Sequence, residues 1–188
     1  DDVSRITGAD YHVSSGGNWV DIDNYDVAIT EYTDNGNIRY LSRKNDNGLL
    51  MDDLVYTYSG NQLLGVEDNA PTIGGFNDGN PIGEDFEYDR AGNMTLDRNK
   101  SLRFDYNYLN LPERVYPQST GNDEIRYIYD ASGNKLQKIA TVDAATTKTT
   151  YSGTMVYLGE PPNMNLDYII TSEGTMEGSG GYTYFLKD

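Results

Sequence analysis

A single histidine limits the acid–base and nucleophilic chemistry that this chain could perform. His12 is the only imidazole in 188 residues, and a Ser-His-Asp triad cannot be assembled without one. It follows Tyr11 in a weakly patterned stretch, where an ordinary exposed or half-buried histidine is the expected role. The chain also has no Gly-x-Ser-x-Gly elbow and no phosphate-binding loop. We therefore expect no catalytic and no cofactor-binding residues.

Acidic residues are numerous enough to supply the carboxyl pair of a glycosidase by type alone. Hydrolysis of a glycosidic bond needs two carboxyl groups about 5–9 Å apart, and nothing in the sequence indicates that any two converge. Solvated strand faces and turn caps are the expected positions of the candidates, which are Glu31, Glu84, Glu87, Glu113, Glu124 and Glu160. The sequence therefore predicts a protein that is not an enzyme.

One acidic segment has the alternating oxygen ligands that calcium prefers. Asp21-Ile22-Asp23-Asn24-Tyr25-Asp26 carries them, and hard cations bind oxygen donors. The segment lacks the glycine at the sixth position and the glutamate at the twelfth that complete an EF-hand loop. We expect no bound metal, and we expect Asn45-Asp46-Asn47-Gly48 to form a turn.

Tyrosine dominates the aromatic residues, with 17 Tyr against four Phe and one Trp. Exposed aromatic rings on strands can stack on sugars, and the candidates for that role are Trp19, Tyr25, Tyr40 and Tyr116. Tyrosines at every second position also form the cross-strand ladders that a β-array needs. Packing is the favoured role, and a module that binds carbohydrate or a cell surface is the alternative.

Composition excludes several classes of partner. The formal charge is −16, from 30 acidic and 14 basic residues, which repels nucleic-acid phosphates and anionic membrane surfaces. No run approaches the ~20 apolar residues of a membrane span. Cysteine is absent, so disulfides, cysteine nucleophiles and thiolate metal sites are excluded.

A tyrosine, a short polar gap and Gly-Asn recur along the chain, and repeats of this period determine an architecture. The copies begin at Tyr32, Tyr58, Tyr88, Tyr106 and Tyr129, and the second is shortened. The repeated positions are Tyr32, Gly36, Asn37, Tyr58, Gly60, Asn61, Tyr88, Asp89, Gly92, Asn93, Tyr106, Asn107, Asn110, Tyr129, Asp130, Gly133 and Asn134.

Each copy has the properties of a β-hairpin. Aromatic and polar residues alternate before the turn, as in Ile125-Arg126-Tyr127-Ile128-Tyr129, and this period indicates a half-buried strand. Glycine supplies the positive φ that the turn needs, and Asn110 takes its place in the fourth copy. The Asp after Tyr (Asp89, Asp130) can accept backbone N–H groups and stabilise the turn. Thr33 and Asn107 stand there in the first and fourth copies.

Further strands are expected between and beyond the repeats, without any convincing helical period. Residues 68–85 are rich in Gly, Asn, Asp and Pro and are expected to form the largest loop, with Ile73 and Phe76 as apolar anchors. The other expected loop is 117–123, and 141–150 is expected to connect two strands. The expected strands include 19–20, 27–32, 38–42, 54–58, 86–89, 102–106, 125–130, 155–158 and 166–171.

The repeated phrase resembles the YD repeats of the RHS family, which also occur in bacterial insecticidal toxin complexes and in teneurins. The resemblance covers roughly residues 27–156, through Tyr-Asp-x-x-Gly-Asn and its variants. Residues 106–115 and 181–188 are also similar to phrases of Bacteroidetes-type RHS proteins, in which the second precedes the RHS core.

The resemblance and the hairpin pattern together predict an all-β array of consecutive antiparallel hairpins forming a curved, twisted strip. We expect one YD-repeat domain over 1–188. Residues 1–26 would be a partial first repeat, 27–156 the YD repeats, and 157–188 strands leading toward an RHS core. In the family such strips form a shell around a C-terminal cargo, often a toxin.

The resemblance therefore implies a non-catalytic structural segment of a large bacterial RHS protein, secreted or on the cell surface. Its partners would be the rest of that protein and its cargo. We further expect Tyr88, Tyr106 and Tyr129 to be largely buried on one face. Free sheet edges are expected near 6–13 and 182–186.

Overall fold

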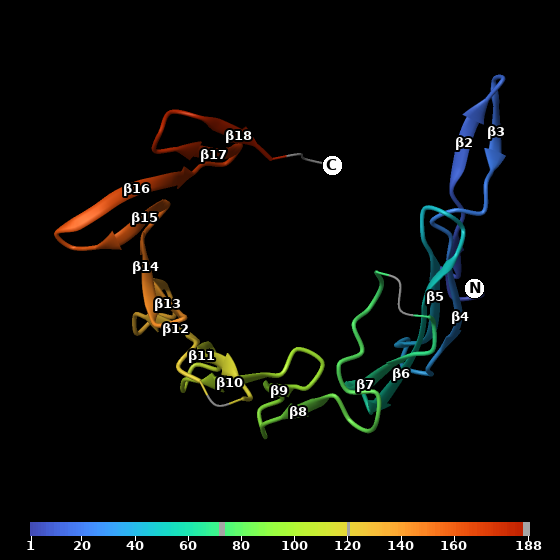
Figure 1. Cartoon of the computed structure of the whole chain (residues 1–188), viewed down its shortest axis with the longest axis horizontal. Coiled ribbons are helices and arrows are strands. Elements are labelled where there is room, and N and C mark those ends of the chain that lie inside the picture. Colours follow the sequence, from blue (N-terminus) through green and yellow to red (C-terminus); the bar gives the residue numbers. More distant parts are fainter. Residues whose placement is uncertain (72–73, 120, 186–188) are drawn as a thin grey trace. The chain divides into compact units, whose positions relative to one another are not determined.

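The computed structural model describes residues 1–71, 74–119 and 121–185, and the chain divides into two compact units, Asp1–Lys100 and Ser101–Asp188. The boundary between the units falls inside the repeat region expected over 27–156. Both units consist of antiparallel strands, and the residues described contain no helix (Figure 1). The all-β array of hairpins predicted from the sequence is confirmed. No helix in these ranges could cross a membrane.

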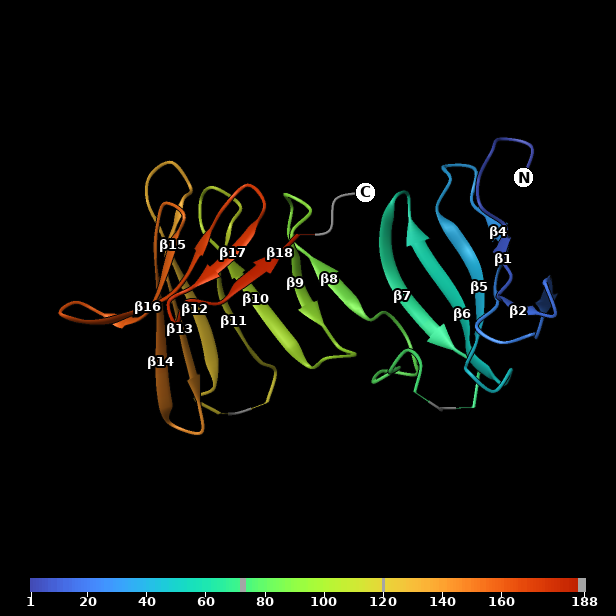
Figure 2. The same cartoon turned by 90° about the horizontal axis from the view of Figure 1, so that it is seen from above.

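The first unit contains an open five-stranded sheet and two further hairpins, of which β2–β3 forms a sheet of its own. The sheet has the order β1-β4-β5-β6-β7, and Figure 2 shows β5, β6 and β7 side by side. Its strands are β1 (Gly8–Ala9), β4 (Val27–Tyr32), β5 (Ile38–Lys44), β6 (Leu50–Ser59) and β7 (Gln62–Asp68). The hairpins are β2 (His12–Ser15) with β3 (Asn18–Asp21), and β8 (Phe86–Tyr88) with β9 (Met94–Asp97).

A small apolar core holds the second of these hairpins to the sheet. Leu54, Val66 and Phe86 are buried together, with Phe76 and Tyr88 packed against them. Phe76 is therefore an anchor of the long loop, as predicted, whereas Ile73 lies outside the described residues. The β2–β3 hairpin contacts no other strand of the described chain, and Trp19 on β3 is 75% exposed.

Buried aspartates fasten the loop between β7 and β8. Asp52 accepts hydrogen bonds of 2.5 Å from Arg43 Nε and from the backbone N–H of Phe76. Asp85 accepts one of 2.6 Å from the N–H of Val66. Both aspartates are almost completely buried, and buried carboxylates are tolerated when such donors satisfy them. The described part of this loop is therefore joined to the core at Phe76 and Asp85 despite its polar composition.

The second unit is a meander in which each strand pairs with the next. Its first four strands are β10 (Leu102–Tyr106), β11 (Pro112–Pro117), β12 (Glu124–Tyr129) and β13 (Lys135–Val142). The others are β14 (Ala145–Ser152), β15 (Met155–Glu160), β16 (Asn163–Ile170), β17 (Gly174–Glu177) and β18 (Tyr182–Tyr184). The unit buries Val156 almost completely.

One predicted connection is wrong. Residues 141–150 do not join two strands as a loop, because β13 and β14 pair through to Val142 opposite Ala145. Asp143 and Ala144 alone form the turn, with φ of 50° and 65°, as a two-residue type I′ hairpin requires. Alanine is an unusual residue at positive φ, and the sequence pattern therefore did not reveal this turn.

The sheet edges are partly where the sequence places them. Among the described residues, β18 pairs with β17 alone, so Tyr182–Tyr184 forms the expected edge, while Leu186 lies outside the described residues. The stretch 6–13 is not one edge strand. It is divided between β1, at the edge of the first sheet, and the start of β2 in the separate hairpin.

Candidate functional site: the recurring tyrosine and turn module

The repeated phrase forms one turn geometry, which we call the repeat turn. It is a five-residue loop with two backbone hydrogen bonds. In the third copy Asp89 N–H donates to Asn93 O at 2.9 Å, and Gly92 N–H donates to Asp89 O at 3.1 Å. The same two bonds close the turns that begin at Thr33, Asn107 and Asp130. Four of the five copies therefore share a backbone conformation.

The first side chain of the turn binds the backbone inside it. Asp130 Oδ1 accepts the N–H groups of Ser132 and Asn134 at 2.8 and 2.9 Å, and Oδ2 accepts Asn134 Nδ2 at 2.8 Å. These bonds, led by that from the Asn134 side chain, lower the pKa of Asp130. Asp89 has the same partners and the same direction of pKa shift. Asn107 Oδ1 accepts the equivalent two backbone N–H groups, from Leu109 and Leu111.

Positive φ occurs at every position where the repeat requires it. Gly36, Gly92 and Gly133 have φ of 84°, 88° and 85°, and Asn110 has 58°, so this prediction is confirmed. The shortened copy differs, because Gly60 and Asn61 alone connect the paired residues Ser59 and Gln62.

Two further turns share this geometry although no tyrosine precedes them. One is the turn predicted at Asn45-Asp46-Asn47-Gly48, which is confirmed, and the other was not predicted. They begin at Asn45 and Glu177, and each makes both backbone bonds of the repeat turn. Asn45 Oδ1 also accepts the N–H groups of Asn47 and Leu49, at 2.9 and 3.0 Å. The glycine three residues after the first residue is common to both turns, as it is in the copies that begin at Thr33, Asp89 and Asp130.

A β-bulge accompanies every repeated tyrosine. The register shifts beside Tyr32, Tyr58, Tyr88, Tyr106 and Tyr129, so that the strand after each turn carries one extra residue. The extra residues are Arg39, Leu64, Thr95, Glu113 and Leu136. Bulges increase the local twist and redirect side chains. Nothing in the alternating sequence pattern predicted them.

The tyrosine hydroxyls connect neighbouring hairpins by one rule. Tyr58 donates to the carbonyl of Ile38 at 2.9 Å, and Ile38 is the residue that pairs with the preceding Tyr32. Tyr88 donates to Leu63, the partner of Tyr58, at 2.7 Å.

The rule continues in the second unit. Tyr129 donates to Pro112, the partner of Tyr106, at 2.9 Å. The first tyrosine, Tyr32, donates to the carbonyl of Ile6. Each of these tyrosines therefore joins its own hairpin, through a hydrogen bond, to the part of the chain that precedes it.

The expectation that these tyrosines are largely buried is wrong. Tyr88, Tyr106 and Tyr129 are half-buried, because each lies at the end of a hairpin where only part of its ring is covered. The partial burial raises the pKa of the Tyr58, Tyr88 and Tyr129 hydroxyls by desolvation. Their placement on a common face involves both units and stays a prediction.

Most candidate glutamates are used in ion pairs. Glu31 pairs with Arg39 at 3.0 Å, and Glu87 pairs with Arg98. Glu124 binds both Arg114 and Arg126, which lowers its pKa, and Glu160 pairs with Lys148. Glu84 contributes its backbone carbonyl, which accepts bonds from Asn80 and Arg98. Exposed ion pairs of this kind contribute little stability. They lie on solvated strand faces, which are the positions that the sequence predicts for these glutamates.

The acidic segment 21–26 binds a lysine of its own chain. Lys44 Nζ pairs with Asp23 and Asp26, and this contact lowers the pKa of Asp23 and raises that of Lys44. In the described part of the chain no three acidic or histidine side chains are grouped to hold a metal ion. His12 is exposed, with Nδ1 3.3 Å from the carbonyl of Asp10.

The aromatic residues proposed for sugar stacking are mostly exposed. Trp19, Tyr25 and Tyr40 are 75%, 54% and 37% exposed, so none of the three is buried in a core. Tyr25 packs edge-on against Tyr11, with ring centroids 5.2 Å apart. Tyr116 is half-buried, and Arg114 lies over its ring at 4.2 Å.

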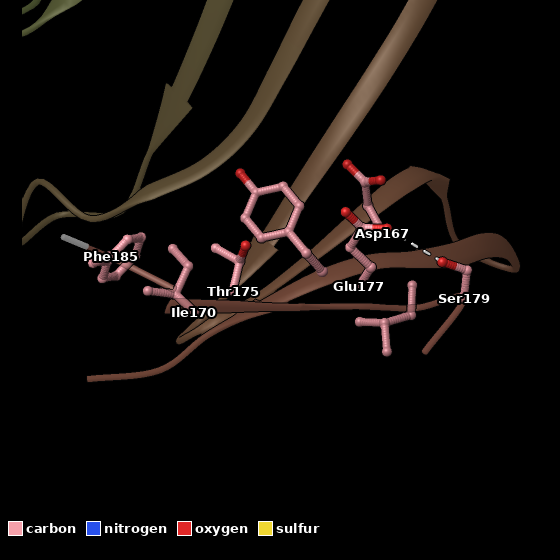
Figure 3. A pocket seen from close by; sticks show the side chains of 8 residues that line it. Asp167, Ile170, Thr175, Glu177, Ser179 and Phe185 are labelled. Atoms are coloured by element: carbon pink, nitrogen blue, oxygen red, sulfur yellow. Dashed lines mark hydrogen bonds between the residues drawn. The ribbon is translucent and has the colours of Figure 1, made fainter. Parts of the chain in front are cut away.

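A groove of about 600 Å³ lies on the last hairpins of the second unit. Figure 3 shows Ile170, Thr175 and Phe185 toward one end and Asp167, Glu177 and Ser179 toward the other. Ser179 donates a hydrogen bond of 3.3 Å to Glu177. No histidine, cysteine or lysine is among the described residues that line this groove.

Comparisons with known proteins show a distant likeness among solved structures. No protein-family model matches the chain, and no curated protein matches it. Among solved structures, the chain is similar to a chain of the crystal structure of TcdB2-TccC3-TEV, at 12% identity and a TM-score of 0.30. The likeness covers 84% of this chain and 13% of that chain.

Proposed function

We propose that this chain is a non-catalytic structural segment of a β-wall, in which each hairpin is fastened to chain that precedes it. The observation that carries the proposal is the tyrosine rule. Tyr58, Tyr88 and Tyr129 each donate to the carbonyl of the residue that pairs with the preceding tyrosine. A hairpin alone is marginally stable in water, so repeated bonds between hairpins serve the cohesion of an array.

The use of the polar residues supports this role. The aspartates of the repeat turns accept bonds within their own turns. Four of the six candidate glutamates form ion pairs, and three of these pairs join two strands. Most of the carboxylates considered for chemistry therefore hold strands and turns together. A catalytic site would instead need such groups convergent and accessible to a substrate.

The finer proposal follows the resemblance to the RHS family. The wall would belong to a large exported or surface protein of a bacterium and would enclose or present a C-terminal cargo such as a toxin. The partners of the segment would then be the remainder of its own protein and that cargo.

Limited proteolysis of the complete natural polypeptide tests this proposal. The cargo region should resist protease in the intact protein and become sensitive when the wall is unfolded by denaturant. The same cargo region expressed alone provides the matched comparison. Equal rates of cleavage in the two contexts would exclude an enclosing wall. Saturable, sugar-specific binding of this chain on a glycan array would favour the carbohydrate-binding alternative.

A further inference from the structure

Two grooves occupy equivalent places between neighbouring hairpins, one in each unit. Their volumes are about 600 Å³ in the second unit and about 450 Å³ in the first. We call them the Glu113 groove and the Arg39 groove. Tyr127 and Tyr129 line the Glu113 groove, and Tyr56 and Tyr58 line the Arg39 groove. The repeated tyrosine and the residue two positions before it thus form the same wall in both.

The bulge residue distinguishes the two grooves. Glu113 and Arg39 are both the extra residue of the bulge beside the repeated tyrosine of the preceding hairpin. Both line their groove, so equivalent positions carry opposite charges. In these two hairpins the bulge therefore places residues of opposite charge beside equivalent pairs of tyrosines.

The two charges also differ in their partners. Arg39 forms an ion pair of 3.0 Å with Glu31. Glu113 is exposed, and no hydrogen bond or ion pair joins it to another residue of the described chain. Asp130 is the other carboxylate that lines the groove, but its oxygens bind its own turn. No lysine or arginine lines the Glu113 groove.

The tyrosines of the Glu113 groove form an aromatic surface next to this carboxylate. The rings of Tyr127 and Tyr129 lie 6.4 Å apart, and Tyr108 is 82% exposed at the tip of its turn. Tyr127 already attracts a cation, because Lys135 Nζ lies 4.6 Å from its ring centroid. Lys135 does not line the groove. Glu113 also lines a neighbouring groove with Arg114 and Arg126, but in the described chain both arginines form their ion pairs with Glu124.

We propose that the Glu113 groove binds a small organic cation bearing an alkylated ammonium group. Tyrosine faces attract such cations through the ring quadrupole, and their methyl groups bury against the rings. A neighbouring carboxylate adds charge attraction, and the overall charge of −16 raises the local concentration of cations. The Arg39 groove has the same tyrosines and a guanidinium, so it repels the same ligand.

The other charged groups near the Glu113 groove contact partners of their own. Arg126 is bound to Glu124 at 2.5 Å, which raises the pKa of Arg126, and the charges of Glu113 and Asp105 raise it further. Asp105 also lies 3.4 Å from the Tyr116 hydroxyl. Lys135 lies between the rings of Tyr127 and Tyr151, at 4.6 and 5.7 Å. None of these cations neutralises Glu113 by direct contact.

Titration of the whole chain with choline, followed by NMR of the tyrosine rings, tests the proposal. The neutral analogue 3,3-dimethylbutan-1-ol has the same shape without the charge and serves as the ligand control. We expect saturable binding of choline in the millimolar range or tighter, with the shifts confined to Tyr108, Tyr127 and Tyr129. The neutral analogue should bind at least about threefold more weakly.

Matched variants assign the site. Glu113→Gln and Tyr127→Leu should each weaken choline binding by about threefold to tenfold, whereas Tyr56→Leu, at the equivalent place in the Arg39 groove, should leave it unchanged. Circular dichroism identifies any variant that fails to fold, and Glu113→Gln lies on the surface, where folding tolerates change. Equal binding of the neutral analogue, an unchanged affinity in Glu113→Gln, or no saturation up to about 100 mM would overturn the proposal.

Discussion

The hydroxyl of Tyr58 lies 2.9 Å from the backbone carbonyl of Ile38, the residue that pairs with Tyr32 in the preceding hairpin. The bond passes from the end of one hairpin to the bulged strand of the one before it. The bulge and the hydroxyl therefore act at the same place. This relationship recurs for Tyr88 and Tyr129, which makes it a property of the repeat.

Removing one such hydroxyl should weaken the chain measurably. We expect Tyr129→Phe to lower the free energy of unfolding by about 0.5–1.5 kcal/mol, because the Pro112 carbonyl loses its donor. Tyr108→Phe is the control, since Tyr108 is 82% exposed and should change stability by less than about 0.5 kcal/mol. Chemical denaturation measures both. Equal losses in the two variants would show that the hydroxyl bond contributes nothing specific.

Acid should weaken the repeat turns through their aspartates. The turn bonds lower the pKa of Asp130 and Asp89 in the folded chain, so the unfolded chain binds more protons as the pH falls. This stability is fully present above the unfolded pKa of about 4 and is lost as the pH falls through the folded pKa.

The variant Asp130→Asn separates the turn from its charge. Asn107 shows that asparagine accepts the same two N–H groups, so the variant keeps the turn and loses the titration. Its stability should fall less between pH 5 and pH 2 than that of the parent chain. Asp34→Asn, at an exposed position of another turn, should follow the parent. The denaturation midpoint of each variant, measured across that pH range, tests this prediction. The same fall in midpoint for Asp130→Asn and for the parent chain would contradict it.

Glycine at the fourth position of the turn is replaceable only at a cost. Gly92→Ala should destabilise the chain by about 1–2 kcal/mol, because φ of 88° is strained for an L-residue although no atom lies within 4 Å of the added Cβ. Gly133→Ala should cost more, since its Cβ would lie 3.2 Å from Leu111 Cδ1.

The controls for the glycine series come from the chain itself. Gly92→Asn should cost less than Gly92→Ala, because Asn110 occupies the same turn position at positive φ. Gly121→Ala, where φ is not positive and nothing lies within 4 Å, should be nearly neutral. Thermal unfolding of the four variants gives the order, and an alanine at residue 92 as harmless as one at residue 121 would refute the turn argument.

The sequence reveals the parts of the fold that follow from local chemistry. The alternation before Tyr32 predicts a strand at 27–32, which is β4 as observed, and Gly-Asn predicts where the chain turns. The bulges at Arg39 and Glu113 and the hydroxyl bond from Tyr129 to Pro112 could not be predicted in this way. They depend on the register between strands, which the alternating pattern of one strand does not specify.

The type of a residue also did not predict which polar side chains are buried. Asp52 is among the least exposed residues of the chain, although its type predicts a surface position. The Arg43 side chain and the N–H of Phe76 give its two carboxylate oxygens partners, and Phe76 belongs to a loop distant in sequence. Only the folded chain brings these three residues together.

Asp52 should therefore be among the most sensitive positions of the first unit. We expect Asp52→Ala to destabilise that unit by about 3 kcal/mol, since it leaves the buried N–H of Phe76 without an acceptor and Arg43 without its partner. Asp52→Asn keeps one acceptor and should cost less. Hydrogen exchange of the Phe76 and Val66 amides measures the effect locally. Asp46→Ala, at an exposed position of the Asn45 turn, is the control and should leave both amides protected. Unchanged exchange at Phe76 in Asp52→Ala would mean that the loop is held by its apolar contacts with Leu54 and Val66 instead.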